Sequence, residues 1–269
     1  MKTTVTSSAT LTSALIWRAR KEGFSSILVT PAVLAVLFGA ITVIASLASG
    51  PTGSGASTSE VVLGVPVTGV GQVTGLMLLP MVFLVGLGMG GGLCAQSLLG
   101  SEITSGSFEL WLSRIGPRAI ATGLFKAALV GLLAIWVMLL VIGGALFGIL
   151  AALPSGPLPV NLPYVLFCLL LPLGLGVASV AAAVGITLMN PKLASANARG
   201  IAHGTGAVVT LIAVLPQLLV TVVVVILGRT GATMAVIGGI GAAIAVVVAA
   251  IAIVLGTTKL SRDQIVSSL

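Results

Sequence analysis

Long apolar runs alternate with short polar segments along most of the chain. Six of these runs reach the length of about 20 residues that an α-helix needs to cross the hydrocarbon core of a bilayer. The predicted spans are residues 26–49, 74–100, 119–152, 164–189, 204–228 and 231–257. Lipid offers no hydrogen-bond partners, so backbone polar groups inside it must be satisfied within helices or a closed barrel. No series of short alternating strands is evident, so the pattern predicts one all-α polytopic membrane domain over residues 1–269.

The segment before the first span, residues 1–25, is polar and then amphipathic. Apolar Leu11, Leu15 and Trp17 are interleaved with basic residues such as Arg18. This pattern favours a helix that lies along the membrane surface, with the Trp17 ring at the level of the lipid headgroups. A basic flank that only fixes the orientation of the first span is the alternative.

The remaining connections are predicted from their turn residues. Residues 50–73 are rich in Gly, Ser and Thr and form the longest extramembrane segment, in which residues 61–70 either dip toward the membrane or stay external. Residues 153–163 contain four prolines and predict a turn-rich loop, and residues 258–269 form a polar tail. Residues 46–48 resemble a signal-peptide cleavage site, but the preceding apolar run is longer than a signal peptide normally has.

The segment 101–118, SEITSGSFELWLSRIGPR, is too polar to remain in a bilayer. Its apolar residues recur at helical spacing and form one stripe: Phe108, Trp111, Leu112 and Ile115. Glu102 and Glu109 recur at the same spacing on another face. We therefore expect a short amphipathic helix on the membrane surface, with its acidic face toward the cytosol.

Composition and charge agree with a membrane protein. Hydrophobic residues make up 58% of the chain and charged residues only 6%, whereas about a quarter of a soluble domain is charged. The net charge of +7 does not indicate nucleic-acid binding, because the basic residues flank apolar spans. If both termini are cytosolic, all of the 12 Lys and Arg residues except Arg229 lie on or near the cytosolic side. The positive-inside rule therefore predicts that orientation.

Residues that usually carry enzyme chemistry are sparse. The two cysteines, Cys94 and Cys168, fall inside predicted spans, and His203 is the single histidine. We expect no metal site and no catalytic site. A Walker A motif is also missing, so the chain is not expected to hydrolyse nucleotide itself. Any ATP and Mg²⁺ would act on a partner subunit.

Two features within the spans have both a structural and a functional interpretation. Gly86 and Gly90 have the GxxxG spacing that lets helices approach closely, or they belong to a flexible gate. Gln217 follows Pro216, so its side chain either hydrogen-bonds a carbonyl freed by the proline or lines a substrate path.

The segment between the second and third spans resembles the ABC-2-type (type V) family of ABC exporter permeases. The residues that carry the likeness are Glu102, Gly106-Ser107-Phe108-Glu109-Leu110-Trp111-Leu112-Ser113 and Arg118. The amphipathic start, the six spans and the cytosolic termini also resemble that family. Two departures are that Pro117 directly precedes Arg118 and that the segment between spans five and six is very short.

The resemblance implies a coupling helix over residues 101–118, with Glu102, Gly106, Glu109, Trp111 and Arg118 as the residues that transmit the action of an ATPase. It further implies ABC ATPase partner subunits and a second copy of this chain or a homologous permease. The expected location is a prokaryotic cell membrane. A lipophilic or amphipathic substrate suits the apolar spans. The alternatives are an autonomous carrier or channel and a membrane scaffold without transport activity.

Overall fold

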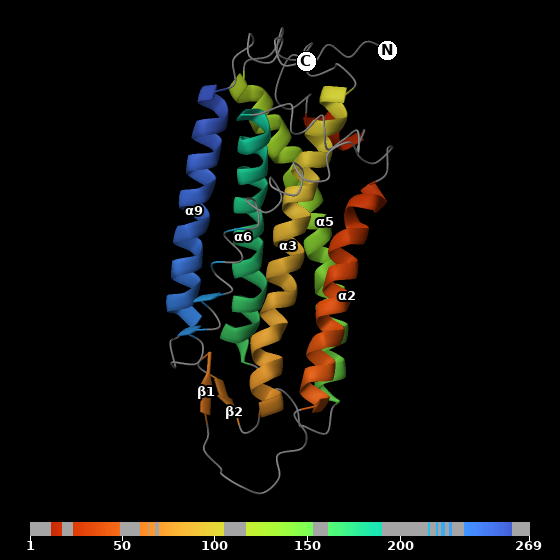
Figure 1. Cartoon of the computed structure of the whole chain (residues 1–269), viewed down its shortest axis with the longest axis vertical. Coiled ribbons are helices and arrows are strands. Elements are labelled where there is room, and N and C mark those ends of the chain that lie inside the picture. Colours follow the sequence, from red (N-terminus) through yellow and green to blue (C-terminus); the bar gives the residue numbers. More distant parts are fainter. Residues whose placement is uncertain are drawn as a thin grey trace, which may run out of the picture.

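The chain is described here as a computed structural model that covers residues 12–17, 24–48, 60–63, 65–67, 70–104, 117–152, 161–189, 215, 219, 222–223, 226–227 and 234–259. Its long helices are α2 (Phe24–Ala48), α3 (Val70–Thr104), α5 (Pro117–Ala151), α6 (Leu162–Met189) and α9 (Met234–Lys259). They lie side by side in an elongated bundle (Figure 1). The described part of the chain is therefore almost entirely α-helical, as its apolar runs predict.

Four helices in the described residues are long and apolar enough to cross a membrane, judged by length and composition. Their apolar windows are Gly75–Ala95, Arg118–Ala151, Leu162–Met189 and Met234–Gly256, and α2 contributes the shorter stretch Pro31–Ala45. Each window coincides with a predicted span. The remaining predicted span, 204–228, is described only at residues 215, 219, 222–223 and 226–227, all of which are helical.

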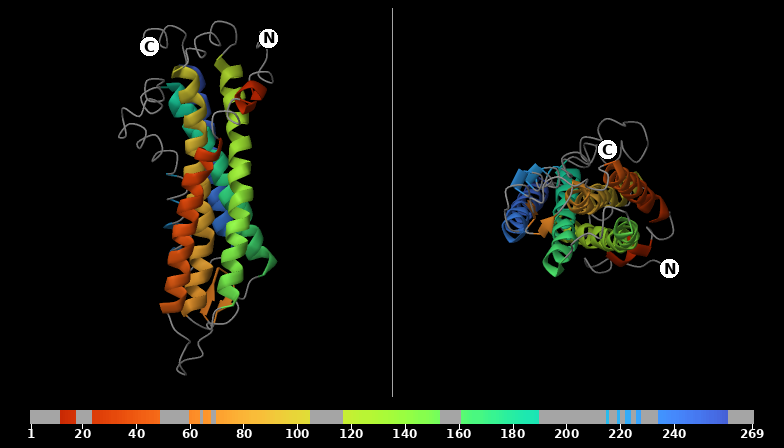
Figure 2. Two further views of the ribbon diagram at one scale, coloured as in Figure 1. Left: turned by 90° about the vertical axis from the view of Figure 1, so that its right-hand side faces the viewer. Right: turned by 90° about the horizontal axis from the view of Figure 1, so that it is seen from below.

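Contacts between glycines and neighbouring helices fix the directions of the helices. Gly86 of α3 faces Leu139 of α5, and Gly90 faces Ile135, so these two helices are antiparallel. Gly91 of α3 approaches Gly176 of α6, further along both helices than the contact of Leu76 with Tyr164, so α3 and α6 are parallel. Figure 2 shows the same packing from the side and from below.

Helix α3 lies at the centre of the bundle and packs against α2, α5 and α6. Of its apolar window 81% is buried, against 22% of the window in α9. The outer helices expose large aliphatic side chains, among them Val33, Ile44, Val141 and Val246. Such apolar surfaces are costly in water and favourable in lipid, so this distribution is compatible with a membrane-embedded bundle.

One hydrogen bond connects the start of α6 to α3. Pro80 lies inside α3 and has no N–H, so the carbonyl of Leu76, four residues earlier, lacks its usual helical donor. The hydroxyl of Tyr164 donates to that carbonyl oxygen at 2.8 Å and is buried there. Asn161 fixes the position of Tyr164, because its Oδ1 accepts the N–H of Tyr164 at 2.9 Å as an N-cap.

A β-hairpin covers the end of the bundle at which α3, α6 and α9 begin (Figure 1). Strand β1 (Glu60–Val62) pairs antiparallel with β2 (Val65–Val67). Leu63 starts the connection with a φ of 52°, a left-handed conformation that is unusual for a bulky residue. Its side chain is nevertheless fully buried, in one cluster with side chains of the three helix ends. This hairpin is a strand element that the sequence analysis did not predict.

Near the opposite end, residues 12–17 are helical and lie against α5. The hydroxyl of Thr12 donates to the carbonyl of Gly123 at 3.4 Å. Leu15 is buried in the bundle core, whereas Trp17 is exposed. This distribution fits an amphipathic helix over the described part of residues 1–25. That it lies on a membrane surface stays a prediction.

Candidate functional site

The predicted coupling segment joins two helix ends at one end of the bundle. Helix α3 continues to Thr104, so Glu102 belongs to its last turn, and Arg118 belongs to the first turn of α5. The end of α3, the start of α5 and the end of α9 lie at the same end of the bundle in Figure 1. Gly106, Glu109 and Trp111, together with the rest of residues 105–116, lie outside the described residues.

Beside this junction lies a cavity of about 410 Å³, which we call the Arg118 cavity. Three helices line it: α5 with Arg118, Ala121, Thr122 and Phe125, α6 with Val184, Gly185 and Leu188, and α9 with Ile253, Val254 and Thr258. The threonine hydroxyls both donate to carbonyls of their own helices, Thr122 to Arg118 at 2.7 Å and Thr258 to Val254 at 2.9 Å. The guanidinium of Arg118 is therefore the charged group of an otherwise apolar cavity.

A close contact between α6 and α9 borders this cavity. A Cβ atom built on Gly185 would lie 2.6 Å from the carbonyl carbon of Ala252, and one on Gly256 would lie 2.8 Å from the Cα of Gly185. The backbones of the two helices thus touch at this level, which only glycine permits.

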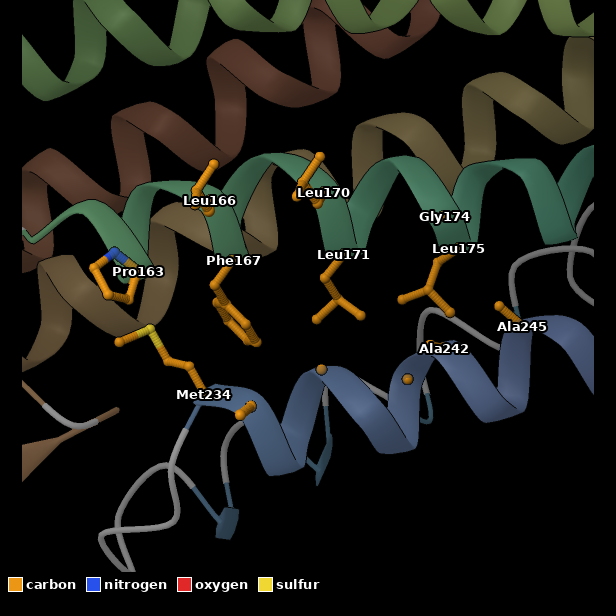
Figure 3. Close-up of a pocket in the computed structure, with 13 residues that line it drawn as sticks. Pro163, Leu166, Phe167, Leu170, Leu171, Gly174, Leu175, Met234, Ala242 and Ala245 are labelled. Carbon is orange, nitrogen blue, oxygen red and sulfur yellow. The ribbon is translucent and has the colours of Figure 1, made fainter.

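A second cavity lies between the first halves of α6 and α9 (Figure 3). Its volume is about 420 Å³, and only apolar side chains and glycines line it. Phe167, Leu171 and Leu175 point from α6 toward Met234 and Ala245 of α9 in Figure 3. Because none of these side chains forms strong hydrogen bonds, this groove can hold apolar material but cannot select a polar group.

Gly90, a predicted gate residue, lies where three helices meet. A Cβ atom there would be 2.7 Å from Cδ1 of Ile135 and 3.0 Å from Cγ of Pro31. Gly90 therefore lets helices pack closely, which is one of the two roles considered for it. The other role, as part of a flexible gate, stays a prediction. Pro216 and Gln217 lie outside the described residues.

The described residues contain no cluster of three or more His, Cys, Asp or Glu side chains that could hold a metal ion. Cys94 and Cys168 are free and buried. The buried polar side chains in this part of the chain, apart from Tyr164, are Thr42, Ser179 and Thr187, and the hydroxyls of Thr42 and Thr187 donate to carbonyls of their own helices. The hydroxyl protons of Thr42 and Thr187 are therefore already used within their own helices.

Sequence reasoning singled out Arg118 but missed the cavity beside it. The cavity walls come from residues near positions 120, 185 and 255, and no local motif connects these regions. The sequence contained one signal. Gly185 and Gly256 lie near the ends of two long apolar runs, and small residues at such positions indicate that two helices pack closely there.

Comparisons of the chain with protein-family models, curated proteins and solved structures gave no match. The functional argument therefore rests on the residues of this chain.

Proposed function

We propose that this chain is the membrane-spanning permease subunit of an ATP-binding cassette exporter. The observation that carries the proposal is the place of the motif-bearing segment. It connects α3, the most buried helix of the described bundle, to α5. The helix ends that it joins lie at the end of the bundle where Arg118 and Lys126 on α5 and Lys259 on α9 are found. By the positive-inside rule, a basic end faces the cytosol, where an ATPase would dock.

The central position of α3 supplies a way to transmit force. A displacement at its last turn acts on every helix that packs against it, because packed interiors shift as units and do not deform continuously. In this proposal an ATPase subunit docks on Glu109 and neighbouring residues of 101–118, and Trp111 holds the coupling helix against the membrane domain. ATP binding on the partner then moves α3 relative to α5.

The remaining parts of the assembly follow from the same proposal. Two permease chains, identical or homologous, act with two ATPase subunits that carry ATP and Mg²⁺. Each chain spans a prokaryotic cell membrane six times with both termini in the cytosol. The apolar groove between α6 and α9 favours a lipophilic or amphipathic substrate over a polar one.

An autonomous carrier or channel would need polar or charged groups at depth to bind its cargo or its coupling ion. Among the described residues the buried polar side chains outside Tyr164 are those of Ser and Thr, and no charged side chain is buried. A membrane scaffold without transport activity is the other alternative. Affinity purification of the chain from its native membrane separates the permease from both alternatives, because only the permease is expected to retain a stoichiometric soluble ATPase.

A pair of variants tests the coupling segment. Glu109→Arg replaces attraction to a basic docking surface by repulsion, so the ATPase should no longer co-purify. Trp111→Ala removes the apolar anchor, so the ATPase should still bind while the permease no longer stimulates its ATP hydrolysis. Binding is measured by co-purification of the ATPase, and stimulation is measured after the permease and the ATPase are combined in lipid vesicles.

Glu60→Arg is the matched control, because it makes the same charge change in β1, at the opposite end of the bundle. It should leave ATPase binding and stimulation at the level of the unmodified chain. Wild-type behaviour of both Glu109→Arg and Trp111→Ala would contradict the assignment of residues 101–118 as the coupling element.

A further inference from the structure

Arg118, the charged residue of the Arg118 cavity, lies at a helix position where a positive charge does not stabilise the helix. Arg118 lies in the first turn of α5, where the helix dipole is positive and a cation is disfavoured. The first turn of α5 contains no acidic residue that would offset this charge. An anion bound beside the guanidinium would remove the unfavourable interaction, and arginine binds phosphate through two parallel hydrogen bonds.

The cavity continues from this charge into an apolar region. Phe125, Leu188 and Ile253 line it, one from each helix. Phe125 lies two turns beyond Arg118 on α5, or about 10 Å along the helix axis. The cavity thus has a cationic end and an apolar end, and its polar hydroxyls are already bonded to helix carbonyls. This arrangement complements an anionic amphiphile.

The length of α5 places the cationic end at the level of lipid headgroups. The helix has 35 residues and a length of about 50 Å, whereas the hydrocarbon core of a bilayer is about 30 Å thick. Part of the helix therefore extends beyond the hydrocarbon, and the charges of Arg118 and Lys126 near its start favour that end. The Arg118 side chain is exposed there.

We propose that the Arg118 cavity binds one anionic phospholipid of the surrounding leaflet. The phosphate pairs with the guanidinium of Arg118, and one acyl chain lies among Phe125, Leu188, Ile253 and Val254. The bound lipid fills the space between α5 and α9 beside the coupling segment. The inference requires that the chain is embedded in a membrane, but it does not require the proposed export function.

The test is native mass spectrometry of the purified full chain, titrated with dioleoyl phosphatidylglycerol. Dioleoyl phosphatidylcholine, dodecyl phosphate and inorganic phosphate are the comparison ligands. The unmodified chain should bind phosphatidylglycerol more tightly than phosphatidylcholine. Arg118→Gln should weaken phosphatidylglycerol binding about fivefold, which is the effect expected of one cation at a membrane surface. It should weaken phosphatidylcholine binding less, because the choline ammonium offsets the charge of that lipid's phosphate.

Two matched controls separate the site from general effects of charge and bulk. Lys126→Gln removes an exposed cation of the same helix that does not line the cavity, so it should retain the preference for phosphatidylglycerol. Val254→Trp fills the apolar part and should weaken the binding of both phospholipids, whereas Val247→Trp, on the same helix but outside the cavity, should weaken neither.

Equal binding of phosphatidylglycerol to the unmodified chain and to Arg118→Gln would overturn the proposal. Tighter binding of dodecyl phosphate than of phosphatidylglycerol would also overturn it, since the site would then suit a free amphiphile and not a membrane lipid. Displacement of the lipid by inorganic phosphate at similar concentrations would show that the acyl chain does not contribute. All three measurements are made without an ATPase, so they are independent of the export proposal.

Discussion

At the scale of single residues, Tyr164 of α6 replaces a hydrogen bond that Pro80 removes from α3. The proline leaves the Leu76 carbonyl without its helical donor, and the tyrosine hydroxyl takes the place of the missing N–H at 2.8 Å. An unsatisfied carbonyl in a buried apolar environment costs about 1–3 kcal/mol. The hydrogen bond therefore stabilises the contact of α6 with α3 and compensates the break that Pro80 makes in α3.

We predict that Tyr164→Phe lowers the free energy of unfolding by about 1–2 kcal/mol, because the Leu76 carbonyl then loses its replacement donor. In a Pro80→Ala background the backbone N–H of residue 80 restores the helical bond, so Tyr164→Phe should cost markedly less. Equilibrium unfolding in mixed detergent measures the four proteins of this double-mutant cycle. Equal costs in the two backgrounds would contradict the account.

The same chemistry can be predicted from the sequence at Pro216, which frees a carbonyl, and at the adjacent Gln217, which has a donor. Neighbours in sequence can be paired by inspection. Tyr164 and Leu76 are 88 residues apart, and only helix packing brings them together. For the same reason a sequence motif was enough to single out Arg118, whereas the cavity beside it could be found only from the positions of three helices.

At the scale of elements, glycines determine how closely helices approach. Gly86 and Gly90 accept Leu139 and Ile135 of α5, a contact that the GxxxG spacing had predicted without its partner. Gly185 and Gly256 bring α6 and α9 into backbone contact. A methyl group added at Gly185 or Gly256 would meet backbone, so the neighbouring helix would have to move away, whereas at Gly86 or Gly90 it would meet the ends of side chains.

We predict that Gly185→Ala destabilises the bundle by about 1–3 kcal/mol, because the new methyl group meets the backbone of Ala252 and not a flexible side chain. Gly174→Ala is the matched control on the same helix, since nothing lies within 4 Å of its added Cβ. Alanine favours helix over glycine by about 0.5–1 kcal/mol, so this control should be neutral or stabilising. Thermal unfolding in detergent compares the two variants. A stable Gly185→Ala protein would contradict the close contact.

The long helices were predictable because each apolar run is long enough to reveal its type, and α2, α3, α5, α6 and α9 follow the predicted spans within a few residues. The hairpin was not. The segment EVVLGVPV is too short for a clear period of two, and its surroundings are rich in turn residues. Burial of Val62, Leu63 and Val67 against the helix ends provides the stabilisation that the short segment lacks alone.

At the scale of the whole molecule, the directions of α6 and α9 constrain the path of the chain. Pro163 and Met234, at the starts of the two helices, line the same groove, and Gly185 meets Ala252 near their ends, so the helices are parallel. The end of α6 and the start of α9 therefore lie at opposite ends of the bundle. Residues 215, 219, 222–223 and 226–227, which come between the two helices in the sequence, are helical, and the span 204–228 stays a prediction.

We predict from the parallel directions of α6 and α9, and from the position of the basic residues, that the chain crosses the membrane six times with both termini in the cytosol. Single cysteines placed at residues 58, 157 and 230 should react with a membrane-impermeant thiol reagent added outside intact cells. Those at residues 4, 110, 196 and 266 should react only after the cells are opened. Cys94 and Cys168 can remain in place, because both are buried, at 1% and 4% exposure. Outside labelling at residue 196 would mean that α6 ends on the external side and would overturn the topology. Outside labelling at residue 110 would in addition remove the coupling segment from the side on which ATP is available.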